Sequence, residues 1–541
     1  MTTPQILDAA GNPIPKRRAG LTGTRPFDAA DRQSQELRDW NPVLSSPDAA
    51  MNPDRDTIVS RVRDLVRNDG WASGGVTKIC DAVVGADLRL SARPDYRALA
   101  RWSSRFDAVW AKEFSDAAEG AWRAWAYDTA KWCDVTRTLQ VPGLFRLAFR
   151  HLLVDGDALA ALPWRPNRVG PGRARLATTV QLIHPDRLCN PQNRFDDLTM
   201  RGGVQVDEDG AATGYHIRRA HEGDWWAAAQ SQSWDLVPRE TDWGRPVMVH
   251  YFEAEEAGQH RGAGGLFAPI LARLRMLARY DAAELQQAVV NAIFGAYIES
   301  PHDPDLVQEA LDPEAVSAMQ GARADFHESK KLSLNGVRIP TLFPGEKMNF
   351  LSSSRPSANF GAFENAVLRN VASGLGLSHP QLSQDWSGVN YSSARAALLE
   401  AWKTLSRRRA EFAAGFCSPI YGAFLEEVFE QGTLPLPAGA PDFMEARSEY
   451  ARCAWIGPGR GWVDPVKEPT GALLKVGGAL SSLTHEAAEN SGMDLEEILD
   501  QRALEVRMFQ ARGLALPEAL SGVSPNVTIN EAPEAAPEGR R

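Results

Sequence analysis

The chain has 541 residues, of which 43% are hydrophobic and 24% charged, a balance typical of a folded soluble protein and unlike that of a disordered or membrane-embedded one. The 59 Lys and Arg residues face 69 Asp and Glu residues, and the net charge of −10 argues against tight binding to nucleic acid phosphates. No run of about 18 apolar residues and no signal-peptide pattern occurs, so we expect a protein that is made and stays in a cytoplasm.

The two ends of the chain lack the periodicity of folded segments. Residues 1–50, rich in Pro, Gly, Asp and Arg, predict an extended arm that lies on a neighbouring molecule and docks through Trp40 and Pro42. Residues 521–541 are dominated by Pro, Ala and Glu and predict a disordered tail. Between these ends the length predicts about three or four domain-sized pieces.

Residues 51–156 carry mainly helical patterns. Asn52 and Pro53 offer a helix start and Gly70 a stop, which predicts a helix of about 16 residues. A shorter helix is expected over 73–85. The aromatic run that follows has helical spacing, and we expect it to pack in a core rather than to stack against bases. Its members are Trp102, Phe106, Trp110, Phe114, Trp122, Trp125 and Trp132.

Alternation of apolar and polar residues predicts strands in the next part. A first strand is indicated at Leu88 and Leu90, and residues 157–256 predict a mainly antiparallel β module with a turn over Glu208–Gly210. Strands are expected at 179–183, 204–206, 215–217 and 247–252. Four tryptophans of this module lie in a polar setting, which leaves open a partner-facing surface or ordinary packing. They are Trp225, Trp226, Trp234 and Trp243.

Long helices dominate the second half. Residues 257–390 hold a predicted long helix that opens at Pro269. A second long amphipathic helix begins near Ser392 and is interrupted at Pro419. The capping-box spacing of Asp494 and Glu497 predicts a last helix.

The sequence shows no residue set for catalysis. A phosphate loop ending in Lys and Ser or Thr is absent, the glycines of Gly457–Gly461 are typical of a turn, and neither H-E-x-x-H nor G-x-S-x-G occurs. Carboxylate pairs such as Asp155 with Asp157 and Asp196 with Asp197 could gather metals in a nuclease, but such pairs are mostly solvated turn residues. The five cysteines lack C-x-x-C spacing and are expected to be reduced. No catalytic residue, metal ligand or cofactor is therefore predicted.

Arg407, Arg408 and Arg409 form the densest internal basic run. They lie on the long helix that begins near Ser392. Because three adjacent residues of a helix cannot share one face, a solvated or subunit-bridging role is favoured over a DNA-binding patch.

Several short segments follow one another in order between about Trp40 and Leu514. They are RVRDLVRNDGW at 61–71, VVG at 83–85, HLLVDGDA at 151–158, IHPDRL at 183–188, GGV at 202–204, VHYF at 249–252, GQHRG at 258–262, GLGL at 374–377, NYSSAR at 390–395, WIGPGR at 455–460 and VDPVKE at 463–468. Each segment alone would be a weak signal, but in this order and spacing they together resemble the lambda family of phage portal proteins.

The resemblance implies a mixed α+β portal fold with long stem and wing helices and an antiparallel β module, assembled as a ring of about twelve subunits at one capsid vertex. It implies neither catalytic residues nor a cofactor. The implied regions are an extended arm (1–50), a helical wing part (51–156), the β module (157–256), a long-helix stem region (257–390), a helical wing or crown region (391–520) and the tail (521–541).

The implied partners are those of a capsid vertex in an infected bacterial cytoplasm and in the virion. They are other copies of the chain, the terminase large subunit, the major capsid and scaffold proteins, the head–tail connector proteins, and double-stranded DNA in weakly bound transit, with no membrane. A channel that lets DNA slide benefits from weak binding, in line with the acidic balance of the chain.

The resemblance also indicates an assembly motif at two places. Its residues are Arg261 and Gly262 after the last strand of the β module, and Asn390, Tyr391, Ser392, Ser393 and Arg395 at the start of the second long helix. Asn390, Ser392 and Ser393 are each able to cap that helix. Arg395 in its first turn opposes the helix dipole and needs a carboxylate or carbonyl partner, either on the adjacent subunit or in the same chain.

Two other functions are weighed against a portal protein. A packaging-pathway enzyme, such as a nuclease or a maturation protease, is opposed by the missing motifs. Another connector or tail component would share the same catalysis-free profile and differ mainly in ring symmetry.

Overall fold

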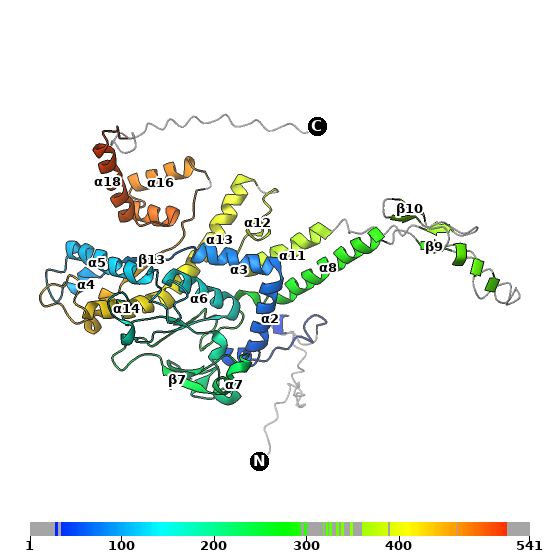
Figure 1. The fold of residues 1–541 in the computed structure, drawn as a ribbon, viewed down its shortest axis with the longest axis horizontal. Coiled ribbons are helices and arrows are strands. Elements are labelled where there is room, and N and C mark those ends of the chain that lie inside the picture. Colours follow the sequence, from blue (N-terminus) through cyan, green and yellow to red (C-terminus); the bar gives the residue numbers. More distant parts are fainter. Residues whose placement is uncertain are drawn as a thin grey trace, which may run out of the picture.

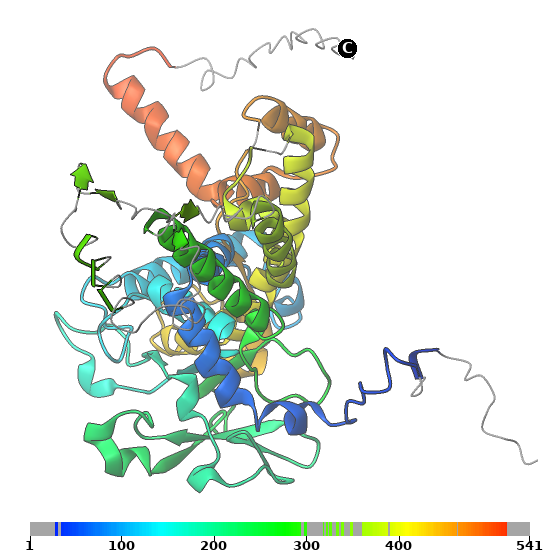
Figure 2. The same ribbon diagram turned by 90° about the vertical axis from the view of Figure 1, so that its right-hand side faces the viewer.

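The computed structural model describes residues 28–30, 34–293, 297–299, 360–387, 390–462 and 464–516, with short pieces at 317–318, 321–322, 324–326, 332–334, 337–339 and 347–349. The predicted tail over 521–541 lies outside the described residues, as do residues 1–27 and 31–33 of the predicted arm. The described part of the arm stands off the body, with Trp40 and Leu44 exposed (Figure 2). None of the described helices is long and apolar enough to span a membrane.

Helices make up about half of the described chain, and short strands, turns and loops make up the rest. The helices are α1 (Pro47–Met51), α2 (Arg55–Asn68), α3 (Gly70–Val83), α4 (Tyr96–Leu99), α5 (Ala108–Ala126), α6 (Val141–Asp155), α7 (Ala228–Ser231), α8 (Leu271–Ile293), α11 (Phe360–Leu375), α12 (His379–Ser383), α13 (Tyr391–Phe412), α14 (Ser418–Glu430), α15 (Arg447–Tyr450), α16 (Lys467–Gly477), α17 (Leu483–Glu486) and α18 (Leu495–Ala511). The strands are β1 (Arg89–Ala92), β2 (Asp157–Ala161), β3 (Gln181–Leu182), β4 (Met200–Arg201), β5 (Val204–Val206), β6 (Ala212–Arg218), β7 (Trp234–Pro238), β8 (Met248–Phe252), β9 (Tyr297–Glu299), β10 (Leu332–Leu334), β11 (Val337–Ile339), β12 (Lys347–Asn349) and β13 (Cys453–Ile456).

The helices α2, α3, α5, α6 and α14 pack around one hydrophobic core (Figure 1). The aromatic run of α5 and the segment before it fills this core, as predicted, through five buried residues: Phe106, Trp110, Phe114, Trp122 and Trp125. The ring of Trp122 makes edge-to-face contacts with Tyr421 and Phe424 of α14, with ring centroids 5.8 and 5.1 Å apart. Trp102 and Trp132 lie half-buried at the rim of the core. The guanidinium carbons of Arg101 and Arg137 lie over their rings, 3.7 and 3.8 Å from the ring centroids.

The first and last parts of the body are joined by one strand pair. The predicted strand at Leu88 and Leu90 is present as β1, and it pairs antiparallel with β13, so that Arg89 faces Ile456 and Ala92 faces Cys453. Residues far apart in the chain therefore belong to the same body. In its core Tyr450 packs against Trp110 and Phe114 of α5, and Phe443 stacks on Tyr450.

The β module lies below the helices in Figure 2 and has its own small core. One sheet has the order β3-β2-β8 and the other β4-β5-β6-β7, with every pair antiparallel. The predicted strands at 204–206, 215–217 and 247–252 are confirmed by β5, β6 and β8, whereas only Gln181–Leu182 of the predicted strand at 179–183 is a strand. The predicted turn is present, with Gly210 at a φ of 84°.

Two long helices, α8 and α11, run side by side away from the body, with β9 and β10 at the far end (Figure 1). The long helix predicted to open at Pro269 begins two residues later, at Leu271. The rings of Tyr280 and Phe360 stack between the two helices at 5.5 Å.

The helix predicted from near Ser392 is α13, which continues through a π-helical turn over Ala413–Cys417 into α14. Pro419 stands in the first turn of α14, and helical backbone runs through it. The prediction that Pro419 interrupts the helix is therefore wrong, and the local irregularity is the π-helical turn just before it. The predicted last helix is α18, whose N-terminus is capped by the side chain of Asp494.

The first predicted helix starts later than expected and ends close to its predicted stop. Asn52 follows α1, and α2 begins only at Arg55. α2 ends at Asn68, and Gly70 is the first residue of α3, whose N-cap Asp69 accepts a hydrogen bond from the Ala72 N–H at 2.8 Å. Asp69 thus ends one helix and caps the next.

Candidate functional site

A group of buried charges joins the helical body to the β module. Arg261, which is fully buried, donates from Nε to Asp157 Oδ2 at 2.9 Å. Its other nitrogens donate to the carbonyl oxygens of Leu188, Gly202 and Pro185 at 2.6, 2.5 and 3.2 Å. One guanidinium group therefore ties three loop carbonyls of the β module to a strand carboxylate.

Asp157, at the start of β2, has no exposed surface. Arg55 Nη2 donates to its Oδ2 at 3.0 Å, the Gly262 N–H donates to its Oδ1 at 2.9 Å, and His250 Nε2 lies 3.0 Å from the same Oδ1. Burial alone would raise the pKa of Asp157. The charge of Arg261, the hydrogen bond from His250 and the charge of Arg55 outweigh burial and hold that pKa well below its usual range.

Gly262 is held against Gly156, the residue between α6 and β2. Gly156 has a φ of 90°, a left-handed conformation that ends α6. A Cβ atom added to Gly262 would overlap the Gly156 carbonyl oxygen. The Gly262 carbonyl oxygen in turn accepts a hydrogen bond from Arg55 Nε at 3.0 Å. Residue 262 therefore has to be glycine for this close approach of two backbones.

Arg261 and Gly262 thus make contacts within the chain that join the β module to α2 and α6. These contacts say nothing about the adjacent subunit, so the assembly role of the two residues stays a prediction.

The other part of the predicted motif opens α13. The Asn390 side chain accepts a hydrogen bond from the Ser393 N–H at 2.8 Å, so Asn390 is the cap among the three candidates. Ser392 and Ser393 lie exposed in the first turn. Tyr391 is the first residue of the helix, and its side chain lies outside the described part.

Arg395 has its carboxylate partner in the same chain. Its Nε lies 3.0 Å from Glu468 Oε1 of α16, where the Arg395 side chain is 46% exposed and the Glu468 side chain 5%. The pair links α13 to the C-terminal helices. Neither residue contacts Arg261, so the two halves of the predicted motif occupy separate junctions of the fold.

The arginine run of α13 is mostly internal, which corrects the expectation of a solvated or bridging role. Arg408 is buried and donates to the Leu375 carbonyl oxygen at 3.0 Å. Arg409 donates to the carbonyl oxygens of Ala82 and Pro458 at 2.7 and 3.0 Å. Arg407, half-exposed, pairs with glutamates of the same chain. The helix is covered on two sides by other elements, so adjacent arginines find carbonyl partners there.

A second charged cluster lies beside the first and holds Arg63 of α2 between two carboxylates. Arg63 Nε donates to Asp155 Oδ1 at 2.7 Å, and its two Nη atoms donate to Asp186 at 2.5 and 2.7 Å. Burial would raise the pKa of Asp186, but the hydrogen bonds and charge of Arg63 hold it below its usual range. Asp155 is buried, and burial would raise its pKa too. The hydrogen bond and charge of His151, followed by the charge and hydrogen bond of Arg63, hold the pKa of Asp155 below its usual range.

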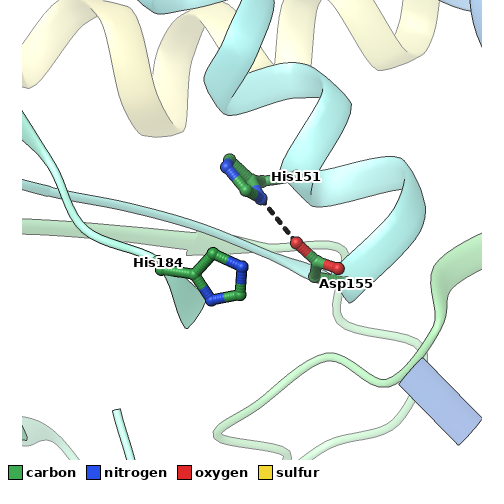
Figure 3. Close-up of side chains that lie close together, drawn as sticks. All are labelled: His151, Asp155 and His184. Atoms are coloured by element: carbon green, nitrogen blue, oxygen red, sulfur yellow. Dashed lines mark hydrogen bonds and ion pairs between the residues drawn. The ribbon is translucent and has the colours of Figure 1, made fainter. Parts of the chain in front are cut away.

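Three histidines surround these carboxylates. His151 Nδ1 lies 2.5 Å from Asp155 Oδ2, and the ring of His184 lies beside that pair (Figure 3). His221 Nε2 lies 3.0 Å from Asp186 Oδ2. Burial lowers the pKa of His184 to about 4, so its ring is neutral at physiological pH. Imidazole and carboxylate groups at this spacing are able to hold a metal ion.

Comparison with known proteins decides which family this fold belongs to. Residues 33–409 match the family described as phage portal protein, lambda family. The chain belongs to the lambda family of phage portal proteins.

Two relatives are about one-third identical to this portal protein over most of its length. Portal protein B of Escherichia phage lambda is 33% identical over 494 residues, which cover 89% of each chain. The portal protein of Escherichia phage N15 is 32% identical over 514 residues, covering 94% of each. A probable portal protein of Halomonas phage phiHAP-1 is 24% identical over 522 residues, covering 93% of this chain and 90% of that protein.

Solved structures similar to this portal protein include the neck of an empty gene transfer agent (GTA) particle computed with C6 symmetry. That match has a TM-score of 0.46 at 14% identity and covers 79% of this chain and 92% of that one. An HK97 family phage portal protein from Corynebacterium diphtheriae gives a TM-score of 0.24 at 13% identity, covering 54% and 85%. The family assignment rests on the sequence matches.

The matches favour a structural portal protein over the alternatives of a packaging enzyme or another connector component, because relatives named portal proteins align over nearly the whole chain.

The buried charges that join the portal's body to its β module were missed by reasoning from the sequence. Asp155 and Asp157 were predicted to be solvated turn residues, and this is wrong, since both are buried. The usable signal was their position between the apolar end of α6 and the apolar strand β2, where a turn has both neighbours in the core. Nothing local in the sequence indicates that Arg55 and Arg63 of α2 supply the counter-charges.

Proposed function

We propose that the chain is the subunit of a closed ring of about twelve copies that forms the DNA channel at one capsid vertex. The observation that carries this proposal is the 33% identity to portal protein B of phage lambda across 89% of both chains. Double-stranded DNA passes through the ring during packaging and ejection.

The ring docks the terminase large subunit while the head fills and the head–tail connector proteins afterwards, and it contacts the major capsid and scaffold proteins around its rim. It assembles in the host cytoplasm and ends in the virion. The net charge of −10 supports weak contact with the passing DNA, because strong phosphate contacts would slow its movement.

The elements are assigned to portal regions as part of the same proposal. The arm over 1–50 lies on a neighbouring subunit, an idea supported by the 71% exposure of Trp40. The paired helices α8 and α11 belong to the stem region over 257–390. Residues 51–156 form part of the wing around the β module over 157–256, residues 391–520 form wing or crown, and residues 521–541 form the tail.

The ring carries no catalysis of its own in this proposal. Purified protein is expected neither to hydrolyse ATP nor to cut DNA with Mg²⁺ or Mn²⁺. Turnover that survives repurification and disappears on mutation of a carboxylate of this chain would contradict the structural role.

Particle symmetry tests the ring directly. Negative-stain images and mass measurements of purified protein should show closed rings of about twelve subunits, because a head-to-tail interface closes on itself only at a fixed rotation. Monomers or dimers alone at micromolar concentration, with and without scaffold protein, would overturn the proposal.

A further inference from the structure

Three side chains on two loops of the β module point their polar atoms at one another. His184 Nδ1 lies 3.7 Å from Asp186 Oδ2, and His221 Nε2 lies 3.0 Å from the same oxygen. One ligand atom from each of the three side chains lies within 4.8 Å of the other two. His184 and Asp186 come from the loop after β3, and His221 comes from the loop after β6.

We propose that His184, Asp186 and His221 bind one divalent transition-metal ion of the Zn²⁺ class, with solvent in the remaining position. The site is independent of ring formation, since all three ligands come from one chain. Two imidazoles select Zn²⁺, Ni²⁺, Co²⁺ or Cu²⁺ over Mg²⁺ and Ca²⁺, which prefer oxygen ligands.

The spacing suits a tetrahedral ion after a small movement. Zinc bonds of about 2.0–2.1 Å place tetrahedral ligand atoms roughly 3.3 Å apart. The two distances to Asp186 Oδ2, 3.0 and 3.7 Å, lie on either side of that value. The neighbouring contact between His151 and Asp155, at 2.5 Å, is too short for two ligands of one ion and is a hydrogen bond instead.

His184 is already in the tautomer that a metal needs. The Asp186 backbone N–H lies 3.3 Å from His184 Nδ1 and donates to it, so this nitrogen carries a lone pair and no proton. The ion takes over that lone pair, and the Asp186 N–H gives up its hydrogen bond when the metal binds. The opposite edge of the ring faces the Asp155 carboxylate (Figure 3).

His221 has to change its tautomer to bind the metal. The Gly223 N–H donates to its Nδ1 at 3.0 Å, so Nε2 carries the proton that points at Asp186. The ion takes the place of that proton between Nε2 and Oδ2. The proton moves to Nδ1, and the Gly223 contact, in an exposed turn, opens.

Arg63 limits the strength of the site without blocking it. Its Nη1 donates to Asp186 Oδ2 at 2.5 Å, but a carboxylate oxygen has two acceptor positions, and the ion uses the one now facing His221. The guanidinium charge opposes a second cation nearby, so we expect weaker binding than at structural zinc sites. The His184 and His221 side chains are each 35% exposed, which leaves a path from solvent.

Calorimetric titration of the full chain with ZnCl₂, after removal of bound metal by a chelator, tests the site. We expect one saturable site per chain, and at least a tenfold loss of affinity in His221→Gln and in His184→Gln. The matched control is His485→Gln, an exposed histidine of α17, which should bind like the wild type. MgCl₂ should give no saturable binding.

Thermal unfolding gives a second measurement that does not depend on the variants. Zn²⁺ should raise the melting temperature of the wild type, since a ligand of the native state stabilises it, whereas Mg²⁺ should not. Absence of saturable Zn²⁺ binding, or unchanged affinity in a folded His221→Gln chain, would overturn the site. Loss of binding in His485→Gln would assign the ion to the C-terminal helices and overturn it as well.

Discussion

At the scale of single residues, the buried carboxylate of Asp157 is the most exacting position in the junction between body and β module. Two arginines and a histidine are built around one negative charge. A buried ion pair adds little net stability when it forms, but removing one partner leaves the other charge buried and uncompensated.

Asp157→Asn should therefore destabilise the protein by about 3–5 kcal/mol at pH 7, measured by urea unfolding. The control Asp209→Asn changes an exposed turn residue and should stay within about 0.5 kcal/mol of wild type. Because the folded pKa of Asp157 is lowered, its contribution is present above about pH 4 and is lost as the pH falls further. Equal stability of the two variants would show that the arginines find other counter-charges.

The pKa of Glu119 in α5 is shifted in the opposite direction, upward. Burial raises its pKa to about 7, although its Oε1 accepts the Ala92 N–H at 2.8 Å. The folded state then holds a proton that the unfolded state releases between about pH 4.5 and 7, so stability falls as the pH rises through this window.

Glu119→Gln keeps the acceptor oxygen for Ala92 and removes the ionisation. The variant should be more stable than wild type at pH 8, and the difference should vanish near pH 4.5, as followed by urea unfolding at both pH values. A constant difference across that range would mean that the carboxyl group is solvated in the folded state.

At the scale of elements, the pair Arg395–Glu468 connects α13 to α16 and is the testable contact of the predicted assembly motif. Arg395→Ala and Glu468→Gln should each weaken this link, and the double variant should cost less than the sum of the two single variants, because they remove the same interaction. Circular dichroism should remain that of wild type. Particle images then separate the roles: rings that persist in both single variants place the pair in the subunit alone, and lost rings with normal helicity place it in assembly.

Local patterns predicted the elements better than their partners. The spacing of Phe106, Trp110 and Phe114 indicated a core face because helical periodicity is local, and the capping residue Asp494 likewise marked α18. The pairing of β1 with β13 left no such mark, since a four-residue strand carries no information about which distant strand completes it. The burial of Asp157 and the histidine cluster escaped prediction for the same reason: each depends on side chains from several elements.

At the scale of the whole molecule, β13 and the residues before it complete a core that begins with α2. A chain ending at residue 440 lacks Phe443, Tyr450 and β13, and so loses the contacts of Tyr450 with Trp110 and Phe114 and of Trp455 with Trp122. It should lose cooperative thermal unfolding and become sensitive to protease.

The matched control ends at Trp462 and keeps β13 while removing α16–α18. Those helices hold to the body mainly through polar contacts such as Arg89–Glu497 at 2.8 Å and Trp402–Glu489 at 2.5 Å, and α18 has no buried residue. The shorter C-terminal cut should therefore preserve a cooperative transition. If the chains ending at residue 440 and at Trp462 both unfold cooperatively, β13 is dispensable for the core.

The pairing of β1 with β13 also sets an order of events during synthesis. Ala92 leaves the ribosome long before Cys453, and at ordinary translation speeds the interval is on the order of tens of seconds. During that interval part of the apolar surface of α3 and α5 is not yet buried by the C-terminal residues and is accessible to chaperones. A polypeptide released early by a stalled ribosome cannot close its body, so truncated products are kept out of any assembly that recognises the closed fold.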